Sequence, residues 1–472
     1  MAIRFSEAVL SALPFQPTTG QWDAIVKIHQ FLTAPQQDAI FILKGYAGTG
    51  KTSLIAALVK ALQPTNFHTL LLAPTGRAAK VLSGYAGKVA TTIHRKIYRY
   101  APGEDGGGNF GLNANAMKNT LIIVDESSLI AYGNSGDDLF RNNVLEDLLQ
   151  FTGMGENCRI MFCGDTAQLP PVGASFSPAL DANFFSTHFH CTVFETTLTE
   201  VVRQEADSGI LFNATRFRAI LLEKEKKIRF QCKGFTDIVP ITGFDLEDIL
   251  NRSYSDFGEE QVAIICRSNK RALAFNKEVR NRLFFREELI SNKDRLMVVR
   301  NNYFWTTPYE GLDFIANGDI LDIVRIRKRG EERYGMSFAD ATVLLSEQNN
   351  APEMEVKILL NLLDSEAAGL SKDDYKKFAD AVMEDFDPAL SRQQKLKLLK
   401  TDPYFNALQV KFAYAITCHK AQGGQWPVVF VDQGYLTDEL VNDDLIRWFY
   451  TALTRASKQV YLVNFNPLFL ED

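Results

Sequence analysis

The chain has 472 residues, of which 46% are hydrophobic and 23% charged, a composition typical of a soluble globular protein with about three or four domains. Its net charge of -6 excludes a basic surface over the whole molecule, so any nucleic-acid contact is expected in one groove. The sequence shows no membrane span, no signal peptide and no C-x-x-C pair among its six cysteines, which predicts a cytoplasmic protein without a zinc site or disulfide framework.

In chain order, the first predicted element is a helix that follows Pro17. Its apolar side carries Trp22, Ile25, Val26, Ile28 and Phe31. Gln21 lies at the start of this helix, and its amide could pair with the edge of an adenine through one donor and one acceptor. The alternative is a solvated glutamine at a helix end, and the sequence leaves both open.

The clearest motif lies between a buried strand at residues 39–43 and a helix that begins at Ser53. Residues 45–52 read G-x-x-x-x-G-K-T, the P-loop that cradles phosphates with backbone N–H groups at a helix N-terminus. Lys51 is expected at the β- and γ-phosphates of ATP, and Thr52 at Mg²⁺. The predicted nucleotide-binding residues of this loop are Gly45, Gly48, Thr49, Gly50, Lys51, Thr52 and Ser53.

A second strand, residues 70–73, runs into a loop at residues 74–80 in which Arg77 and Lys80 could face a phosphate backbone. His94 follows in the segment 91–94. Residues 101–116 are rich in turn formers. They form either a plain surface loop or the tip of a hairpin that carries Phe110.

The third strand, residues 121–124, is followed by two carboxylates. A purely structural role for them is hard to explain, because both charges must stay solvated or paired. Asp125 is expected to hold Mg²⁺, and Glu126 to orient the attacking water as a base. A fourth strand at 159–163 leads to Gln168, which could reach the γ-phosphate. Arg203 follows in the segment 198–204.

A second α/β unit is expected from about residue 195, with strands at 262–266, 428–432 and 460–463. Residues 269–285 and 447–456 have helical patterns. Between them, residues 311–350 look like a small β module, with a strand from Ile320 to Ile326. Residues 354–405 are charged and are expected to form a solvated helical insertion.

Taken together, these segments resemble a superfamily 1 helicase of the 1B branch, similar to RecD and Dda. The motifs occur in the order of that family: residues 45–52 resemble Walker A, 73–80 motif Ia, 92–94 motif Ib, 124–128 motif II, 164–171 motif III, 198–204 motif IV, 417–425 motif V and 450–456 motif VI. Gly76 departs from Dda, which has a histidine there, so that contact with DNA is not carried over.

The resemblance implies an α/β fold with two tandem RecA-like cores, each built on a parallel sheet. The first core would comprise residues 1–94 and 118–194, with a hairpin insertion at 95–117. The second would comprise residues 195–310 and 406–472, with an SH3-like and helical insertion at 311–405.

The resemblance also implies that ATP binds between the cores, where Arg203 and Arg455 would reach the γ-phosphate from the second core. Gln422 and Gly423 would complete the nucleotide site. Single-stranded DNA would cross both cores. Its predicted contacts are Thr75, Arg77, Lys80, His94, Thr417, His419 and Lys420, with Phe110 of the hairpin as the wedge that splits the duplex.

The implied activity is ATP-dependent translocation on single-stranded DNA from 5′ to 3′, with unwinding of duplex DNA. Single-stranded DNA, fork junctions and other replication or repair proteins are the implied partners of a monomer with no membrane contact. Two alternatives stay open. One is an ATP-dependent RNA helicase or nucleoprotein-remodelling translocase. The other is a P-loop ATPase without motor function, which would lack motif V and Arg455.

Overall fold

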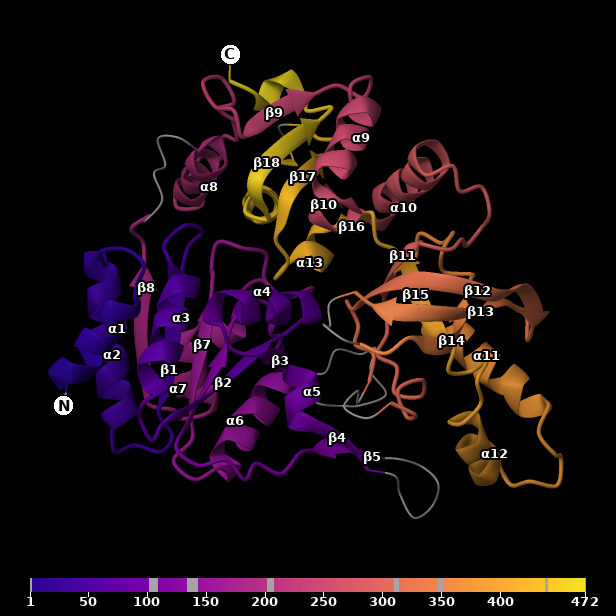
Figure 1. Ribbon diagram of the computed structural model, residues 1–472, viewed down its shortest axis with the longest axis horizontal. Coiled ribbons are helices and arrows are strands. Elements are labelled where there is room, and N and C mark those ends of the chain that lie inside the picture. Colours follow the sequence, from indigo (N-terminus) through magenta and orange to yellow (C-terminus); the bar gives the residue numbers. More distant parts are fainter. Residues whose placement is uncertain are drawn as a thin grey trace.

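The computed structural model describes residues 2–101, 109–133, 143–201, 208–309, 314–346, 351–437 and 440–471. Two parallel sheets with helices on their faces lie one above the other in Figure 1, and a small barrel lies beside them. The expected fold class, two α/β cores with a β insertion in the second, is confirmed.

The first core is built on a six-stranded sheet in which all neighbouring strands are parallel. In spatial order its strands are β3 (Ala90–Thr92), β2 (His68–Ala73), β6 (Thr120–Val124), β7 (Arg159–Gly164), β1 (Ile40–Gly45) and β8 (Val193–Leu198). The sequence predicts that the second core begins at residue 195. That boundary falls inside β8, which pairs with β1 along its whole length, so β8 belongs to the first core.

Helices cover both faces of this sheet because its strands are apolar on both sides. Phe41 and Leu43 of β1 pack with α1 (Ala2–Ala12), α2 (Thr19–Thr33), α3 (Lys51–Leu62) and α4 (Gly76–Ala86). The alternate residues Ile40 and Ile42 pack with α6 (Val144–Met154) and α7 (Ala182–His188). The sheet is therefore a mostly buried layer between helices.

The second core has a five-stranded parallel sheet in the order β16 (Ala415–Thr417), β10 (Val262–Cys266), β17 (Trp426–Asp432), β18 (Ala456–Val463) and β9 (Ile238–Ile241). On one face lie α8 (Gly209–Ile220) and α14 (Asp443–Leu453). On the other lie α9 (Leu246–Phe257) and α10 (Asn269–Glu278), the latter continued by a π-helical turn, Val279–Leu283. The short helix α13 (Cys418–Ala421) follows β16.

The insertion in the second core is a closed barrel with a helical extension. Its strands are β11 (Arg295–Val298), β12 (Ile320–Arg333), β13 (Met336–Leu345), β14 (Met354–Leu359) and β15 (Leu408–Phe412). The helices α11 (Lys372–Glu384) and α12 (Arg392–Leu399) lie between β14 and β15 in the chain.

The limits of this insertion differ from the sequence expectation in two ways. The barrel begins at β11, before residue 311, and ends with β15, beyond residue 405. The helix expected from residue 354 is wrong at its start, because residues 354–359 form β14. Met354, Val356 and Ile358 are buried in the barrel core at every second position, which is the period of a strand.

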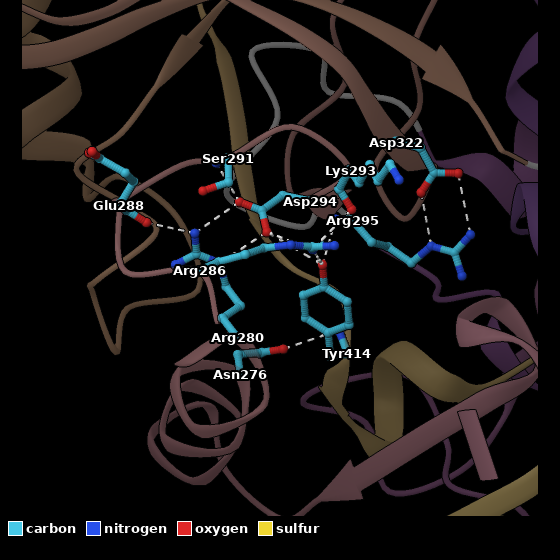
Figure 2. Close-up of polar contacts among 10 residues, drawn as sticks. All are labelled: Asn276, Arg280, Arg286, Glu288, Ser291, Lys293, Asp294, Arg295, Asp322 and Tyr414. Carbon is cyan, nitrogen blue, oxygen red and sulfur yellow. Dashed lines mark hydrogen bonds and ion pairs between the residues drawn. The ribbon is translucent and has the colours of Figure 1, made fainter. Parts of the chain in front are cut away.

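A hydrogen-bonded cluster at Asp294, drawn in Figure 2, joins the second core to the barrel. Asp294 is fully buried and directly precedes β11. Arg280 of the π-helical turn donates to both of its carboxylate oxygens at 3.0 Å, and Arg286 donates to one of them at 3.1 Å. Figure 2 also shows Tyr414, next to β16, beside the same carboxylate.

The hairpin expected in the first core is present as β4 (Tyr98–Ala101) and β5 (Asn109–Leu112), paired in antiparallel register. The hairpin expected from residue 95 starts only at Tyr98, because residues 93–97 form the helix α5 (Ile93–Ile97). Its cap is Thr92, whose hydroxyl accepts a hydrogen bond from the Arg95 N–H. The tip at residues 102–108 and the side chain of Phe110 lie outside the described residues.

None of the described helices has both the length and the apolar character of a membrane span.

Candidate functional site

A cleft of about 690 Å³ lies where the P-loop end of the first sheet faces the second core. The first core contributes the P-loop, Asp125, Glu126 and Gln168 to its lining. The second core contributes Gly423, Arg455 and their neighbours, together with Ser208, Ile210 and Leu211. Residues that are hundreds of positions apart in the chain therefore meet in one cavity.

The P-loop has the backbone geometry that an anion cradle needs. β1 ends at Gly45 and α3 begins at Lys51, so the positive N-terminus of that helix opens at the cleft. Gly48 and Gly50 have φ angles of 77° and 75°, which side chains disfavour. A Cβ on Gly48 would also lie 3.1 Å from Leu211. Of the residues that the sequence assigns to nucleotide binding in this loop, five line the cleft: Gly48, Gly50, Lys51, Thr52 and Ser53.

Three carboxylates surround the Lys51 ammonium. Burial lowers the pKa of Lys51, but Asp125, Glu126 and Asp165 together raise that pKa above its ordinary value. Burial raises the pKa of Asp125, opposed by the nearby Lys51 charge. Lys51 thus carries its full positive charge at neutral pH, as a residue that neutralises phosphates must.

The backbone holds Glu126 in a strained conformation at the end of β6. Its φ of 51° lies in the left-handed region, and the Glu126 N–H donates to the Asp125 carboxylate at 2.9 Å. The Oε2 atom of Glu126 is buried with no hydrogen-bond partner in the described structure. Gln168 has a similarly unpaired Oε1 atom. A ligand or water is therefore needed in the cleft to satisfy these two side chains.

Arg455 of the second core lies across the cleft from Glu126. Its Nη1 is 3.8 Å from a Glu126 carboxylate oxygen. The guanidinium is also fixed by hydrogen bonds to the carbonyls of Thr451 and Gly424, at 3.2 Å each. A cation from one core and a carboxylate from the other thus meet in the same buried site.

The residues predicted to hold a nucleotide and Mg²⁺ fit both groups. Thr52 and Asp125, the predicted metal ligands, line the same cleft. A hydroxyl and a carboxylate are oxygen donors of the kind that Mg²⁺ prefers. In the described part of the chain, no group of three or more His, Cys, Asp or Glu side chains forms a separate metal cluster.

Gln21, Thr49 and Gly45 are predicted nucleotide contacts that do not line the cleft. Gln21 is fully buried, with its Nε2 donating to the Thr49 carbonyl at 2.9 Å and its Oε1 accepting from the Thr18 N–H at 3.1 Å. In this arrangement its amide braces the P-loop and offers no free edge to a base, and it is not solvated either. Thr49 is fully buried and bonds the carbonyl of Tyr46. Gly45 lies at the end of β1, outside the cleft lining.

A second cavity, a groove of about 740 Å³, lies between both cores and the barrel. Six of the predicted nucleic-acid contacts line it: Thr75, Arg77, Lys80, His94, His419 and Lys420. Gln422, predicted at the nucleotide, lines this groove instead. Thr417 lies at the end of β16 but outside the lining. Arg203 lies outside the described residues, as does the side chain of Phe110.

Sequence reasoning missed the groove residues that come from the barrel and from Trp426. The Arg77 guanidinium stacks on the Trp426 ring, 3.9 Å from its centroid. Lys80 donates to the Ser346 carbonyl at 3.2 Å, and Lys420 donates to the Asn317 side chain at 2.7 Å. The sequence around Asn317 indicates only a turn. It does not show that this turn faces the first core, so Asn317 could not be predicted as a groove residue.

Burial also changes the titration of the groove. It lowers the pKa of Lys420 to about 8, with a further contribution from the nearby Lys411. Burial likewise lowers the pKa of His419. His419 is therefore neutral at pH 7.5, whereas most Lys420 side chains keep their charge there.

Comparison with known families identifies two segments. A model described as an AAA domain matches residues 17–215, and one described as a UvrD-like helicase C-terminal domain matches residues 412–463. The first match contains the P-loop, Asp125, Glu126 and Gln168. The second contains Gln422, Gly423 and Arg455. No curated protein matches the sequence.

Among solved structures, the chain is similar to Pif1 helicases. The Bacteroides enzyme in complex with ADP-AlF3 and single-stranded DNA is 15% identical, with a TM-score of 0.47 over 97% of this chain and 95% of the other. The enzyme from Candida albicans is 16% identical, with a TM-score of 0.40 over 96% and 95%. A Pif1 helicase structure from work on DNA unwinding at forked duplexes by two coordinating Pif1 helicases is 13% identical. Its TM-score is 0.48 over 97% of this chain and 95% of the other. At these values the similarity assigns no residue and no activity to this chain.

Proposed function

We propose that the chain is a helicase of superfamily 1, which couples ATP hydrolysis to 5′-to-3′ movement on single-stranded DNA and to the unwinding of duplex DNA. The observation that carries this proposal is the shared cleft. Lys51, Asp125 and Glu126 belong to one core, whereas Arg455 belongs to the other and lies 3.8 Å from Glu126. A site completed by two cores is sensitive to their relative movement, which a motor requires.

The roles proposed in the cleft follow from charge and position. Lys51 and the N–H groups of the P-loop bind the phosphates of ATP. Thr52 and Asp125 hold Mg²⁺, which screens phosphate charge when bound. Glu126 accepts a proton from the attacking water, and Arg455 stabilises the charge that develops on the transferred phosphoryl group. We propose Gln168 as a reporter of the γ-phosphate and Arg203 as a second cation.

We propose that the groove between the cores and the barrel binds single-stranded DNA. Lys80, Arg77 and Lys420 supply positive charge along it, and His94 and His419 supply rings. Both cavities are lined in part by the same residues, among them Val81, Tyr85 and Gln425. Movement of one core therefore changes both sites at once, which supports coupling between DNA and ATP.

The 5′-to-3′ direction and the action at forks rest on the resemblance to the 1B branch. Pif1 helicases, which this chain resembles in fold, have been studied at forked duplex DNA and bound to single-stranded DNA. We propose the same partners here, a monomeric enzyme, and Phe110 as the wedge. The expected domain limits, adjusted to include β8 in the first core and β11 to β15 in the barrel, are part of this proposal.

The test is the steady-state ATPase rate of the full chain with single-stranded DNA, with single-stranded RNA of the same sequence, and without nucleic acid. We expect DNA to raise the rate at least about tenfold, since the completed site gains the effect of Arg455. Equal rates in all three reactions would reject a nucleic-acid motor. Greater stimulation by RNA than by DNA would support the RNA helicase in its place.

A further inference from the structure

Beyond the residues assigned above, the helix α14 of the second core sends one side chain into the P-loop of the first. Tyr450 is 1% exposed, and its hydroxyl lies between two groups of the other core. The backbone N–H of Ala47, in the P-loop, donates to the Tyr450 hydroxyl oxygen at 2.9 Å. The hydroxyl donates in turn to the Asp165 carboxylate at 2.5 Å.

The direction of these two hydrogen bonds is fixed by chemistry. A backbone N–H can only donate and a carboxylate can only accept, so the single hydroxyl proton of Tyr450 must point at Asp165. Burial raises the pKa of Tyr450 well above its ordinary value, which keeps this proton in place. The second oxygen of Asp165 accepts from the Ala167 N–H at 2.9 Å. Both carboxylate oxygens are therefore engaged, one by each core.

Asp165 connects this contact to the phosphate site. Burial raises the pKa of Asp165, and the charge of Lys51 opposes that rise. The same carboxylate raises the pKa of Lys51. The position of Asp165 thus affects the lysine that holds the phosphates, and the position of Asp165 depends on a hydroxyl from the second core.

A second set of bonds grips the loop that follows β7. The Leu169 N–H donates to the hydroxyl of Thr451 at 2.9 Å, and Gln422 donates to the Leu169 carbonyl at 2.7 Å. Arg447 donates to the carbonyl of Thr166. Two segments of the second core, α14 and the loop after α13, therefore hold residues 165–169, the stretch that also carries Gln168.

We propose that Tyr450 is a positioning residue that makes ATP hydrolysis depend on closure of the two cores. Its hydroxyl sets the P-loop and Asp165 relative to α14, and α14 leads directly to Arg455. The Ala47 N–H donates to Tyr450, so phosphate is bound by the other groups of the P-loop. Loss of the Tyr450 hydroxyl therefore affects the catalytic step more than it affects ATP binding. This inference rests on the proposed ATPase function.

The opposing view is that Tyr450 only fills space between the cores. A phenylalanine would fill the same space, so Tyr450→Phe separates the two views. Tyr461→Phe is a matched control, because Tyr461 lies on β18 of the same core, where its ring stacks on Phe430, and it does not line the cleft. Thr451→Val is a second variant that removes the hydroxyl which accepts from Leu169.

The experiment measures kcat and KM for ATP with saturating single-stranded DNA, ATP affinity without DNA, and the thermal midpoint of each variant. For Tyr450→Phe we expect kcat to fall at least about tenfold, the size of effect that loss of one buried hydrogen bond to a charged group allows. KM, ATP affinity and the thermal midpoint stay close to those of the parent. Thr451→Val is expected to follow the same pattern more weakly, and Tyr461→Phe to match the parent.

A kcat of Tyr450→Phe within about twofold of the parent would overturn the inference, as would an equal loss of ATP affinity. If Tyr450→Phe lowers the thermal midpoint, Thr451→Val decides by the same two readings. A parent enzyme without DNA stimulation would reject the proposed motor function. The comparison of basal kcat between parent and variant would still test Tyr450.

Discussion

At the scale of single residues, Glu126 combines backbone strain with an unsatisfied carboxylate oxygen. A non-glycine residue in the left-handed region costs about 1–3 kcal/mol, and such strain is often retained at functional sites. The strain here aims a carboxylate into the cleft beside Arg455. Its Oε2 atom is buried without a hydrogen-bond partner in the described structure, as the proposed role of Glu126 as a base requires.

Changing Glu126 to Gln should stop hydrolysis while ATP still binds. The amide keeps the shape of the side chain but cannot take a proton, and a general base contributes about 10²–10⁴ in rate. Single-turnover ATPase assays with DNA and binding of a fluorescent ATP analogue measure the two effects. Glu146→Gln, on the exposed side of α6, is the control. Hydrolysis at the parent rate would show that Glu126 is not the base.

The lowered pKa of Lys420 predicts that DNA affinity falls as the pH rises. Its pKa is about 8 in the free protein, and a nearby phosphate favours the charged form, so the complex holds more protons than the free protein. Affinity is therefore full below pH 7 and decreases through pH 8, by up to about tenfold between pH 7 and 9. Fluorescence anisotropy at constant salt measures this. Lys420→Arg stays charged and should show a flat profile, and an equal fall in that variant would contradict the assignment.

At the scale of elements, the two cores approach each other closely where the loop after α13 touches α4. Gly423 has a φ of 73°, and a Cβ there would lie 2.8 Å from the Cβ of Ala78 and 3.2 Å from the Thr75 hydroxyl. Backbone from the second core thus rests directly on the start of α4, between the nucleotide cleft and the groove.

Gly423→Ala should therefore keep the cores apart and lower DNA-stimulated ATPase at least about tenfold, because the strain and the clash together exceed 1.4 kcal/mol. Gly153→Ala is the control, since Gly153 lies in α6 with open space around it. Steady-state ATPase assays compare the two. Parent activity in Gly423→Ala would mean that the two cores do not need this close approach.

The cluster around Asp294 fixes the barrel on the second core, so its loss should destabilise that joint. Asp294→Ala leaves the buried Arg280 guanidinium without its carboxylate, at a cost of about 3–5 kcal/mol. Urea denaturation followed by circular dichroism measures the change. Asp380→Ala, an exposed position of α11, should change stability by less than about 0.5 kcal/mol. Equal midpoints for the two variants would contradict a structural role for the cluster.

The sequence predicted seven strands of the two parallel sheets, because each is a short, continuous apolar run: β1, β2, β6, β7, β10, β17 and β18. It did not place the parallel strands β3, β8, β9 and β16, nor β11 and β14 of the barrel, since these strands owe their position to partners far along the chain. β14 alternates buried and exposed residues in only part of its length, because Lys357, on the face opposite the barrel core, is also buried and pairs with Asp340 at 2.6 Å. A charged strand of this kind has the composition of a solvated helix.

At the scale of the whole molecule, three bodies enclose the groove. The Arg95 guanidinium at the base of the hairpin pairs with Asp319 of the barrel at 2.8 Å, and Lys80 of α4 reaches Ser346 beyond β13. The nucleotide residues could be predicted because their motifs are local. These bridges, and the contacts of Tyr450 and Thr451, could not, because they depend on how separate folding units pack.

Direction of movement is likewise a property of the whole motor. We expect unwinding of a partial duplex with a 5′ single-stranded tail and little unwinding of one with a 3′ tail. A gel-based strand-displacement assay with both substrates, with ATP and with a non-hydrolysable analogue as control, measures this. If only the duplex with the 3′ tail is unwound, the enzyme moves from 3′ to 5′, and the proposed direction is wrong.

The order of strands also bears on how the chain folds during synthesis. The first sheet has all six of its strands once residue 198 has been made. The strand β10 of the second sheet, five buried apolar residues, must wait for both of its neighbours, β16 and β17, which end at residues 417 and 432. The barrel and its helices are synthesised in between. A nascent or truncated chain therefore exposes β10 with two unpaired edges, a target for chaperones and a site of aggregation.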